Sequence, residues 1–146
     1  IAWELAQEGK SRHEIVDAIE KEKEKAGIRL TVDNLDYLRK GGRLTGAQAF
    51  VGTMLNIKPV IGLSEGKLIP IEKVRGKKKA IKSMISSIPD NVKRISICHI
   101  LNMEEAEELK QILQEKYPNA SVSIDEVGPV IGSHLGPKAI GICYKW

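Results

Sequence analysis

The sequence is poor in aromatic residues, which make up 4% of its 146 residues. Base stacking on aromatic side chains, a common mode of binding single-stranded nucleic acid, is therefore poorly supported. No apolar run approaches the length of about 20 residues that spans a bilayer, so we expect no stable membrane insertion. The net charge of +4 is mild, and the one dense basic run, at 75–82, is typical of a solvated helix face. We therefore expect no nucleic-acid partner.

Cysteine is equally scarce, since the sequence contains only Cys98 and Cys143. Both lie in apolar, strand-like segments, which suits buried thiols in a reducing cytoplasm better than a disulfide framework. The sequence shows no signal peptide, and we expect a cytoplasmic protein. It begins with Ile1 rather than Met, and its first residues are typical of the tail of a helix. We therefore expect a piece of a longer protein.

Common metal-binding and nucleotide-binding patterns are also missing. Cys98 and His99 are adjacent, so in a strand they point to opposite faces and cannot share a metal ion or act as nucleophile and base. Cys143 and His13 have no suitably spaced partner. The sequence contains neither a Walker-type phosphate loop nor a dinucleotide-binding fingerprint. We expect no metal site and no cofactor.

What the sequence does contain is an alternation of helix and strand patterns along residues 1–146, enough for one domain with a hydrophobic core. Apolar residues recur at helical spacing in some segments and at alternate positions in others. Gly, Pro and capping residues separate these segments. Helices are predicted at 12–26, 34–40, 47–55, 77–88 and 103–116, and strands at 28–32, 57–63, 67–74, 93–100, 121–127 and 138–144.

This order of elements predicts an α/β (α+β) fold, arranged as a two-layer sandwich. The alternation in the second half indicates strand–helix–strand units, and the turn at 64–66 indicates an antiparallel hairpin. We therefore expect a mixed sheet of five or six strands, with helices packed mainly on one face. Pro70 places the strand at 67–74 at an edge of the sheet or beside a bulge.

The stretch from Val127 to Ile142, VGPVIGSHLGPKAIGI, holds four glycines, two prolines and His134. Because Gly and Pro disfavour a regular helix, we expect a buried or half-buried turn between two strands. Such a turn brings a ligand close to the backbone and carries His134 into an apolar place, where it can donate a hydrogen bond to a carboxylate or phosphate. The alternative is a histidine that caps a neighbouring carbonyl in the core.

The helix predicted at 47–55 is apolar on nearly every side, so it must be buried or line a pocket. Arg43 and Arg75 lie in or beside turns, as His134 does. An arginine and a histidine that converge on one point clamp a carboxylate well, whereas each arginine alone is also explained by a surface salt bridge. Together these features predict an apolar pocket with a polar mouth, which suits an amphiphile with a long tail and an acidic head.

Four motifs in order make the sequence resemble the bacterial DegV family. They are L-x-x-L-x-K-G-G-R at 35–43, I-K-P at 57–59, V-R at 74–75 and G-x-x-x-G-x-H-x-G-P at 128–137. The whole chain, 1–146, resembles the C-terminal domain of that family. The resemblance implies a two-layer domain with a mixed sheet that holds most of an acyl chain. It also implies an N-terminal three-layer α/β domain, which is absent from this chain.

The resemblance further implies a function. Family members bind one fatty acid in a tunnel and act as the acyl-carrying subunit of a fatty acid kinase. A separate kinase subunit phosphorylates the bound carboxylate to acyl phosphate for phospholipid synthesis, so the binding subunit itself needs no catalytic residue. The expected partners are a long-chain fatty acid, the catalytic subunit of the fatty acid kinase and the protein's own N-terminal domain.

Roles for single residues follow from their positions in these motifs. His134 and Arg75 are implied to join the hydrogen-bond network around the carboxylate, and Arg43 to dock the kinase partner. Lys138 departs from the family, because many members have Gly there; a lysine would narrow the turn or add a charge near the head group. The side chains expected to line the acyl tunnel are Phe50, Met54, Ile61 and Ile131.

Two other functions remain open at this point. The family is similar in fold to the substrate-binding subunit of dihydroxyacetone kinases, where a histidine engages a small carbonyl substrate. On that interpretation His134 acts on a small polar ligand, and a small polar cavity rather than a long dry tunnel is expected. The third function is an interaction module, in which Arg43 and the basic face at 77–82 contact a kinase subunit or an anionic membrane.

Overall fold

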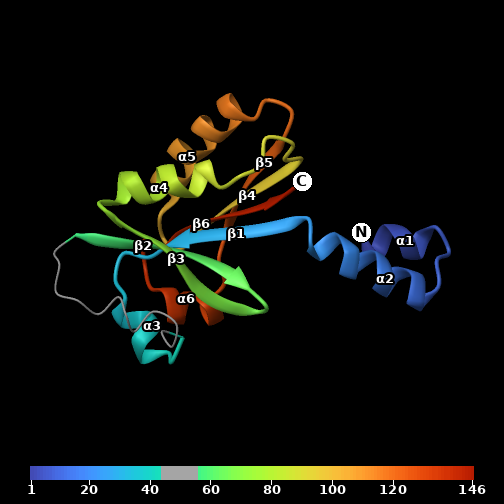
Figure 1. Ribbon diagram of the computed structural model, residues 1–146, viewed down its shortest axis with the longest axis horizontal. Helices are drawn as coiled ribbons and strands as arrows, with labels where there is room; N and C mark the ends of the chain where they lie inside the picture. Colours follow the sequence, from blue (N-terminus) through green and yellow to red (C-terminus); the bar gives the residue numbers. More distant parts are fainter. Residues whose placement is uncertain (44–55) are drawn as a thin grey trace.

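The computed structural model describes residues 1–43 and 56–146, and these residues form one mixed six-stranded sheet in the order β3-β2-β1-β6-β4-β5 (Figure 1). Only β4 and β5 pair in parallel among the described strands. The predicted mixed sheet is therefore confirmed. The strands are β1 Ala26–Thr31, β2 Ile57–Ser64, β3 Lys67–Arg75, β4 Arg94–His99, β5 Ser121–Glu126 and β6 Ile140–Lys145.

The helices lie around the sheet in three groups (Figure 1). The two longer helices of the sheet region, α4 and α5, cover one face, and α5 makes the connection that the parallel strands β4 and β5 need. The short helices α3 and α6 lie together on the other side, and α1 and α2 project beyond the start of β1. The helices are α1 Ala2–Gln7, α2 Arg12–Lys23, α3 Asp36–Lys40, α4 Lys77–Ser86, α5 Met103–Lys116 and α6 Pro129–Leu135. Within the described ranges, none of them has the length and apolar character to cross a membrane.

Apolar side chains on the two faces of the sheet form two separate cores. The larger core joins the sheet to α4 and α5, and includes Met84, Ile97 and Leu109. The smaller core includes Leu38 of α3 and Leu135 of α6. Successive strand residues point to opposite faces, so adjacent residues of one strand contribute to different cores.

The edge of the sheet is formed by β3, as Pro70 predicts. Pro70 pairs with Ile61, and the register shifts between Val60 and Ile61. Proline has no N–H to donate to a ladder, so both the edge position and the irregularity accommodate it. Both features predicted from Pro70 are therefore confirmed: β3 is an edge strand, and its pairing with β2 is irregular.

The turn predicted within 127–142 is wrong, because Pro129–Leu135 form a helix of 7 residues. Pro129 lies in the first turn, where its missing N–H breaks no helical hydrogen bond. Gly132 donates to the carbonyl of Gly128 (3.0 Å), and Gly136 to that of Gly132 (2.8 Å). Gly136 then ends the helix with φ of +77°. The glycines and the proline thus begin and end a short helix rather than prevent it.

One predicted helix falls on residues that the structure does not describe. The apolar helix expected at 47–55, which contains Phe50 and Met54, lies outside the described residues.

Candidate ligand-binding site

An apolar cavity of about 370 Å³ lies between the sheet and α6. Ligand sites commonly have volumes of about 300–1,000 Å³. Carbon-rich side chains from β1, β3, β4, β6 and α6 form most of its wall. The residues that line it are Ile28, Leu30, Arg43, Leu68, Cys98, Ile100, Val127, Ile131, His134, Leu135, Ala139, Ile140, Gly141 and Cys143.

Helix α6 presents one face to this cavity. Ile131, His134 and Leu135 are three and four residues apart, so they lie on the same side of the helix, and all three line the cavity. Val130 and Ser133 point elsewhere and are exposed. The helix that the sequence analysis did not predict is therefore what aims His134 at the cavity. Ile131 lies in the cavity wall, where the sequence analysis expected a tunnel side chain.

The ring of His134 packs directly against the end of α3. Its Nδ1 atom is buried and has no hydrogen-bond partner among the described residues. A Cβ atom built on Gly41 would lie 2.3 Å from that Nδ1 atom. Real side-chain carbons do not approach so closely, so only glycine at position 41 leaves room for the imidazole.

A second glycine completes the contact between α3 and α6. A Cβ atom built on Gly136 would lie 2.4 Å from Cδ2 of Tyr37. Each of the two helices therefore ends in a glycine against which a ring from the other helix packs. This contact explains why a G-G-R motif and an H-x-G-P motif, far apart in the sequence, occur in the same protein.

Arg43 follows the end of α3 and lines the same cavity as His134. Its guanidinium Nη1 donates to the carbonyl of Gly41 at 2.6 Å. The contact of Gly41 with His134 and this hydrogen bond together place the arginine beside the imidazole. The structure thus brings Arg43 and His134 into one cavity wall.

Arg75 does not line this cavity within the described part of the chain. It is the last residue of β3, it is exposed, and it pairs with Ile57 of β2. Ile61 is only 3% exposed and packs in the smaller core with cavity-lining residues such as Leu30 and Leu135, but it does not itself line the cavity. Within the described residues, Arg43 rather than Arg75 shares a cavity wall with His134.

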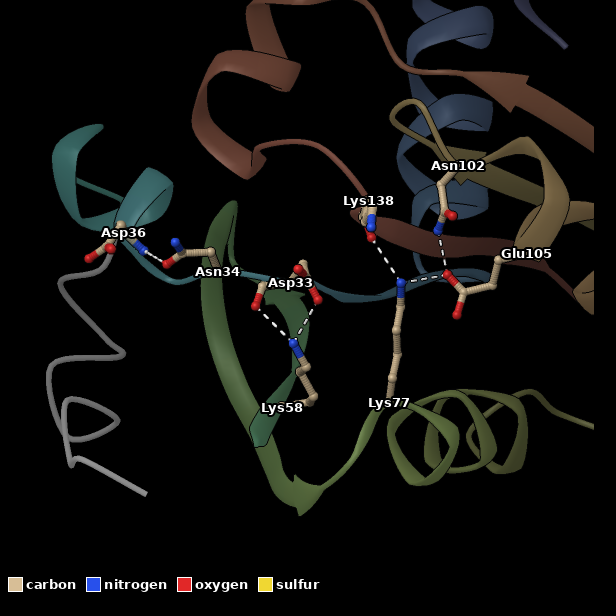
Figure 2. Close-up of polar contacts among 8 residues, drawn as sticks. All are labelled: Asp33, Asn34, Asp36, Lys58, Lys77, Asn102, Glu105 and Lys138. Carbon is tan, nitrogen blue, oxygen red and sulfur yellow. Dashed lines mark hydrogen bonds and ion pairs between the residues drawn. The ribbon is translucent and has the colours of Figure 1, made fainter. Parts of the chain in front are cut away.

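Ion pairs tie together the loops at the end of the sheet from which Arg75 emerges (Figure 2). Lys77 reaches the carboxylate of Glu105 at 2.5 Å and donates to the carbonyl of Lys138 at 3.1 Å. Asp33 pairs with Lys58 at 2.7 Å. The hydrogen bond from Lys58 holds the pKa of the Asp33 carboxyl below its ordinary value of 3.8, although partial burial opposes the shift. These contacts fix the starts of α4, α5 and β6 relative to one another.

Lys138 stands where the backbone has a left-handed conformation, with φ of +61°. Its N–H donates to the carbonyl of Ile100 at 2.9 Å, and its own carbonyl accepts the bond from Lys77. Residues with a Cβ atom are strained in this region. A glycine at this position, which the family resemblance leads us to expect, would adopt this conformation without that strain.

Two cysteines complete the wall on the sheet side. Cys98 of β4 and Cys143 of β6 line the cavity, and their Sγ atoms are 3.9 Å apart. Both thiols are free and half-buried. The sequence analysis identified them as buried thiols but did not place them in the site, because only the pairing of β4 with β6 shows that they meet.

The cavity has the chemistry of an amphiphile site. Arg43 and His134 contribute to a wall whose surface is almost entirely hydrocarbon and sulfur. Among residues 1–43 and 56–146, no group of three or more His, Cys, Asp or Glu side chains is placed to hold a metal ion. An anionic group with an apolar tail matches this distribution of charge and hydrocarbon.

Comparison with known proteins identifies the family of the chain. The family model described as "Uncharacterised protein, DegV family" matches residues 2–145. A DegV domain-containing protein of Staphylococcus aureus is 40% identical over 149 residues, which cover 98% of this chain and 52% of the relative. The chain spans about half the length of the curated relatives it matches.

Solved structures of similar proteins share the fold. DegV of Bacillus subtilis, described as a fatty acid binding protein, has a TM-score of 0.88 at 34% identity, covering 99% of this chain and 54% of that one. The Fatty Acid Kinase B3 protein of Streptococcus pneumoniae, loaded with linoleic acid, has a TM-score of 0.83 at 26% identity, covering 97% of this chain and 52% of that one.

Proposed function

The chain belongs to the DegV family, and from this membership we propose that it binds a long-chain fatty acid in the cavity under α6. The acyl chain lies against the hydrocarbon wall, and Arg43 and His134 hold the carboxylate. The observation that carries the proposal is that one arginine and one histidine line an otherwise apolar cavity. Two relatives described as binding fatty acids support it.

The roles of the two arginines follow from where each one lies. Arg43 shares the cavity wall with His134, so we assign it to the carboxylate. A charge-assisted hydrogen bond from a guanidinium contributes about 1.5–3 kcal/mol, which corresponds to roughly 10–100-fold in affinity. Arg75 is exposed at the end of β3, immediately before the basic start of α4. We assign it to the docking of a partner protein.

The partner that we propose is the catalytic subunit of a fatty acid kinase. The name of the pneumococcal relative, Fatty Acid Kinase B3, supports this assignment. In this scheme the chain is a non-catalytic carrier that acts in the cytoplasm and presents the carboxylate for conversion to acyl phosphate. The second wall of the carboxylate site comes from the N-terminal domain that the family resemblance implies.

A thermal unfolding experiment on delipidated protein tests fatty acid binding. Palmitate is compared with hexadecanol, which has the same chain length but no carboxylate. We expect palmitate to raise the unfolding temperature more than hexadecanol does, because only its carboxylate can form charge-assisted hydrogen bonds with Arg43 and His134. A ligand at 100 times its dissociation constant stabilises the folded state by about 2.7 kcal/mol. In an Arg43→Gln variant the advantage of palmitate over hexadecanol should shrink. Equal shifts with acid and alcohol in the unchanged protein would contradict the proposed role of Arg43 and His134.

The dihydroxyacetone-kinase-like alternative requires a small polar cavity. The cavity wall instead consists mainly of aliphatic side chains, and this composition favours the fatty acid. The same thermal experiment with dihydroxyacetone separates the two functions: we expect no stabilisation by the small polar ketone.

A further inference from the structure

The two cysteines in the cavity wall form a contact that fatty acid binding does not require. Cys98 and Cys143 are diagonal neighbours on adjacent antiparallel strands: Cys98 lies opposite Gly141, and Cys143 lies opposite Ser96. Their side chains point to the same face of the sheet, and the Sγ atoms are 3.9 Å apart. Both sulfurs face the cavity that we assign to the acyl chain.

The local geometry leaves room for the sulfurs to approach each other. A disulfide needs an S–S distance of about 2.05 Å and Cα atoms within about 7 Å of each other, whereas the Cα atoms of diagonal neighbours on a sheet are typically about 7–8 Å apart. Gly141, the residue opposite Cys98, has no side chain that would stand between the two thiols. Bond formation therefore requires a small approach of the two strands as well as rotation of both cysteine side chains.

The surroundings distinguish the two thiols chemically. The hydrogen bond from Cys143 and the contact with the Ser96 hydroxyl (3.5 Å) lower the pKa of Cys98, against the opposing effects of burial and of Asp125. The neighbouring Cys98 and burial raise the pKa of Cys143. Since the thiolate is the reactive form of cysteine, Cys98 is the better nucleophile and Cys143 keeps its proton.

We propose that Cys98 and Cys143 form a dithiol that reduces a hydroperoxide carried on the acyl chain of a bound lipid. This inference rests on the proposed binding of a fatty acid, because the lipid supplies the oxidant. The apolar wall around both sulfurs selects a hydroperoxide that has a hydrocarbon tail over hydrogen peroxide.

The reaction proceeds in two balanced steps. The Cys98 thiolate attacks the distal oxygen of the hydroperoxide, the O–O bond breaks, and the departing lipid alkoxide takes a proton to become a hydroxy lipid. Cys98 is thereby oxidised to a sulfenic acid. The sulfur of Cys143 then attacks the sulfenic sulfur and forms the disulfide, and the released hydroxide takes the proton of Cys143 and leaves as water. One lipid hydroperoxide and two thiols give one hydroxy lipid, one disulfide and one water.

A single-turnover experiment tests the proposal. The reduced protein, free of added thiol, is mixed with the hydroperoxide of linoleic acid, and lipid and protein are both analysed by mass spectrometry. We expect equimolar hydroxy lipid and a disulfide that joins the peptides of Cys98 and Cys143. The reaction should be roughly tenfold or more faster than with hydrogen peroxide at the same concentration, because binding holds the lipid peroxide beside the thiol.

Two variants follow the separate steps. Cys143→Ser should still produce hydroxy lipid but should stop at a sulfenic acid on Cys98, which a dimedone trap detects. Cys98→Ser should produce no hydroxy lipid. Absence of hydroxy lipid in the unchanged protein, oxidation without the Cys98–Cys143 disulfide, or equal rates with both peroxides would each overturn the proposal.

A separate arm distinguishes this inference from the proposed function. Unoxidised linoleic acid is added to the unchanged protein, and thermal stabilisation is measured. Stabilisation without any peroxide reduction overturns only the dithiol reaction. Absence of stabilisation by linoleic acid counts against fatty acid binding itself.

Discussion

The Nδ1 atom of His134 occupies the space that a side chain on Gly41 would need, since a Cβ atom there would lie only 2.3 Å away. Gly41 has an ordinary φ of −76°, so alanine at this position adds a clash without straining the backbone. We expect Gly41→Ala to displace the imidazole and to weaken palmitate binding by about tenfold or more, with an overpacking cost of roughly 1–3 kcal/mol in stability. Calorimetric titration and urea unfolding measure the two effects.

The neighbouring glycine provides a matched control. Gly42 has φ of +71°, and no atom lies within 4 Å of a Cβ built on it. Gly42→Ala should therefore cost about 1–2 kcal/mol through backbone strain and leave His134 in place. If both alanine variants bind palmitate equally well, the contact of Gly41 with His134 does not position the ligand site.

Lys138 is strained by its left-handed backbone, with φ of +61°. We expect Lys138→Gly to raise the free energy of unfolding by about 0.5–1 kcal/mol, since relief of the strain exceeds the extra entropy that glycine loses on folding. Lys82 is an exposed residue inside α4. Because glycine has a low helix propensity, Lys82→Gly should instead lower the free energy of unfolding by about 1 kcal/mol. Urea unfolding measures the free energy of unfolding of both variants. A loss of stability in Lys138→Gly would show that the Lys138 side chain stabilises the fold by more than its left-handed backbone destabilises it.

Local patterns predict most of the sheet and the longer helices. The helix predicted at 103–116 is observed at Met103–Lys116, and Pro70 correctly marks the edge strand. The sequence analysis does not predict helix α6, because its glycines and proline have unfavourable helix propensities. The close contact that requires glycine at position 136 comes from Tyr37 of α3, which is far away in the sequence. Tertiary packing, which no local pattern contains, decides the conformation there.

The arrangement of the site depends even more on tertiary contacts. Sequence motifs single out Arg43, Arg75 and His134, and the resemblance that they carry implies that Arg75 joins His134 at the carboxylate. The packing of α3 against α6 instead brings Arg43 to the cavity that His134 lines, and no local pattern contains that contact. The meeting of Cys98 with Cys143 likewise depends on the register between β4 and β6.

The ion pair of Asp33 with Lys58 predicts a pH-dependent contribution to stability. The pKa of Asp33 is lowered in the folded protein, so its contribution is fully present above the ordinary value of 3.8 and is lost as the pH falls through the folded pKa. We expect Asp33→Asn to cost about 0.5–1 kcal/mol near neutral pH, the upper part of the range for surface ion pairs, because Asp33 is exposed whereas Lys58 is mostly buried. The difference from the unchanged protein should disappear in strong acid.

Urea unfolding at several pH values measures this effect. Asp36→Asn is the matched control, because Asp36 pairs with Arg39 only across one exposed helical turn, and such pairs contribute about 0.3–0.5 kcal/mol. A constant cost of Asp33→Asn at every pH would mean that the charge of Asp33 is not the source of the stabilisation.

Arg75 provides the test of partner docking. It is exposed and lies outside the cavity that Arg43 lines. We expect Arg75→Glu to weaken binding to the catalytic subunit of the fatty acid kinase by at least tenfold, because a like charge opposes an acidic docking surface. Surface plasmon resonance measures the affinity, and Lys82→Glu on the same basic segment controls for the change in net charge. If Arg75→Glu loses its bound lipid but keeps its partner, Arg75 belongs to the carboxylate site.

The most direct measurement is mass spectrometry of an organic extract of the purified protein, with the amount of fatty acid compared with the amount of protein. The account predicts a near-equimolar amount of long-chain fatty acid in the unchanged protein and a strong depletion in a double variant that carries Arg43→Gln and His134→Ala. The double variant must retain its fold, as judged by circular dichroism. Fatty acid at no more than the background of an unrelated protein, or equal amounts in the unchanged protein and the folded double variant, would contradict the proposal that Arg43 and His134 hold the carboxylate of a bound fatty acid.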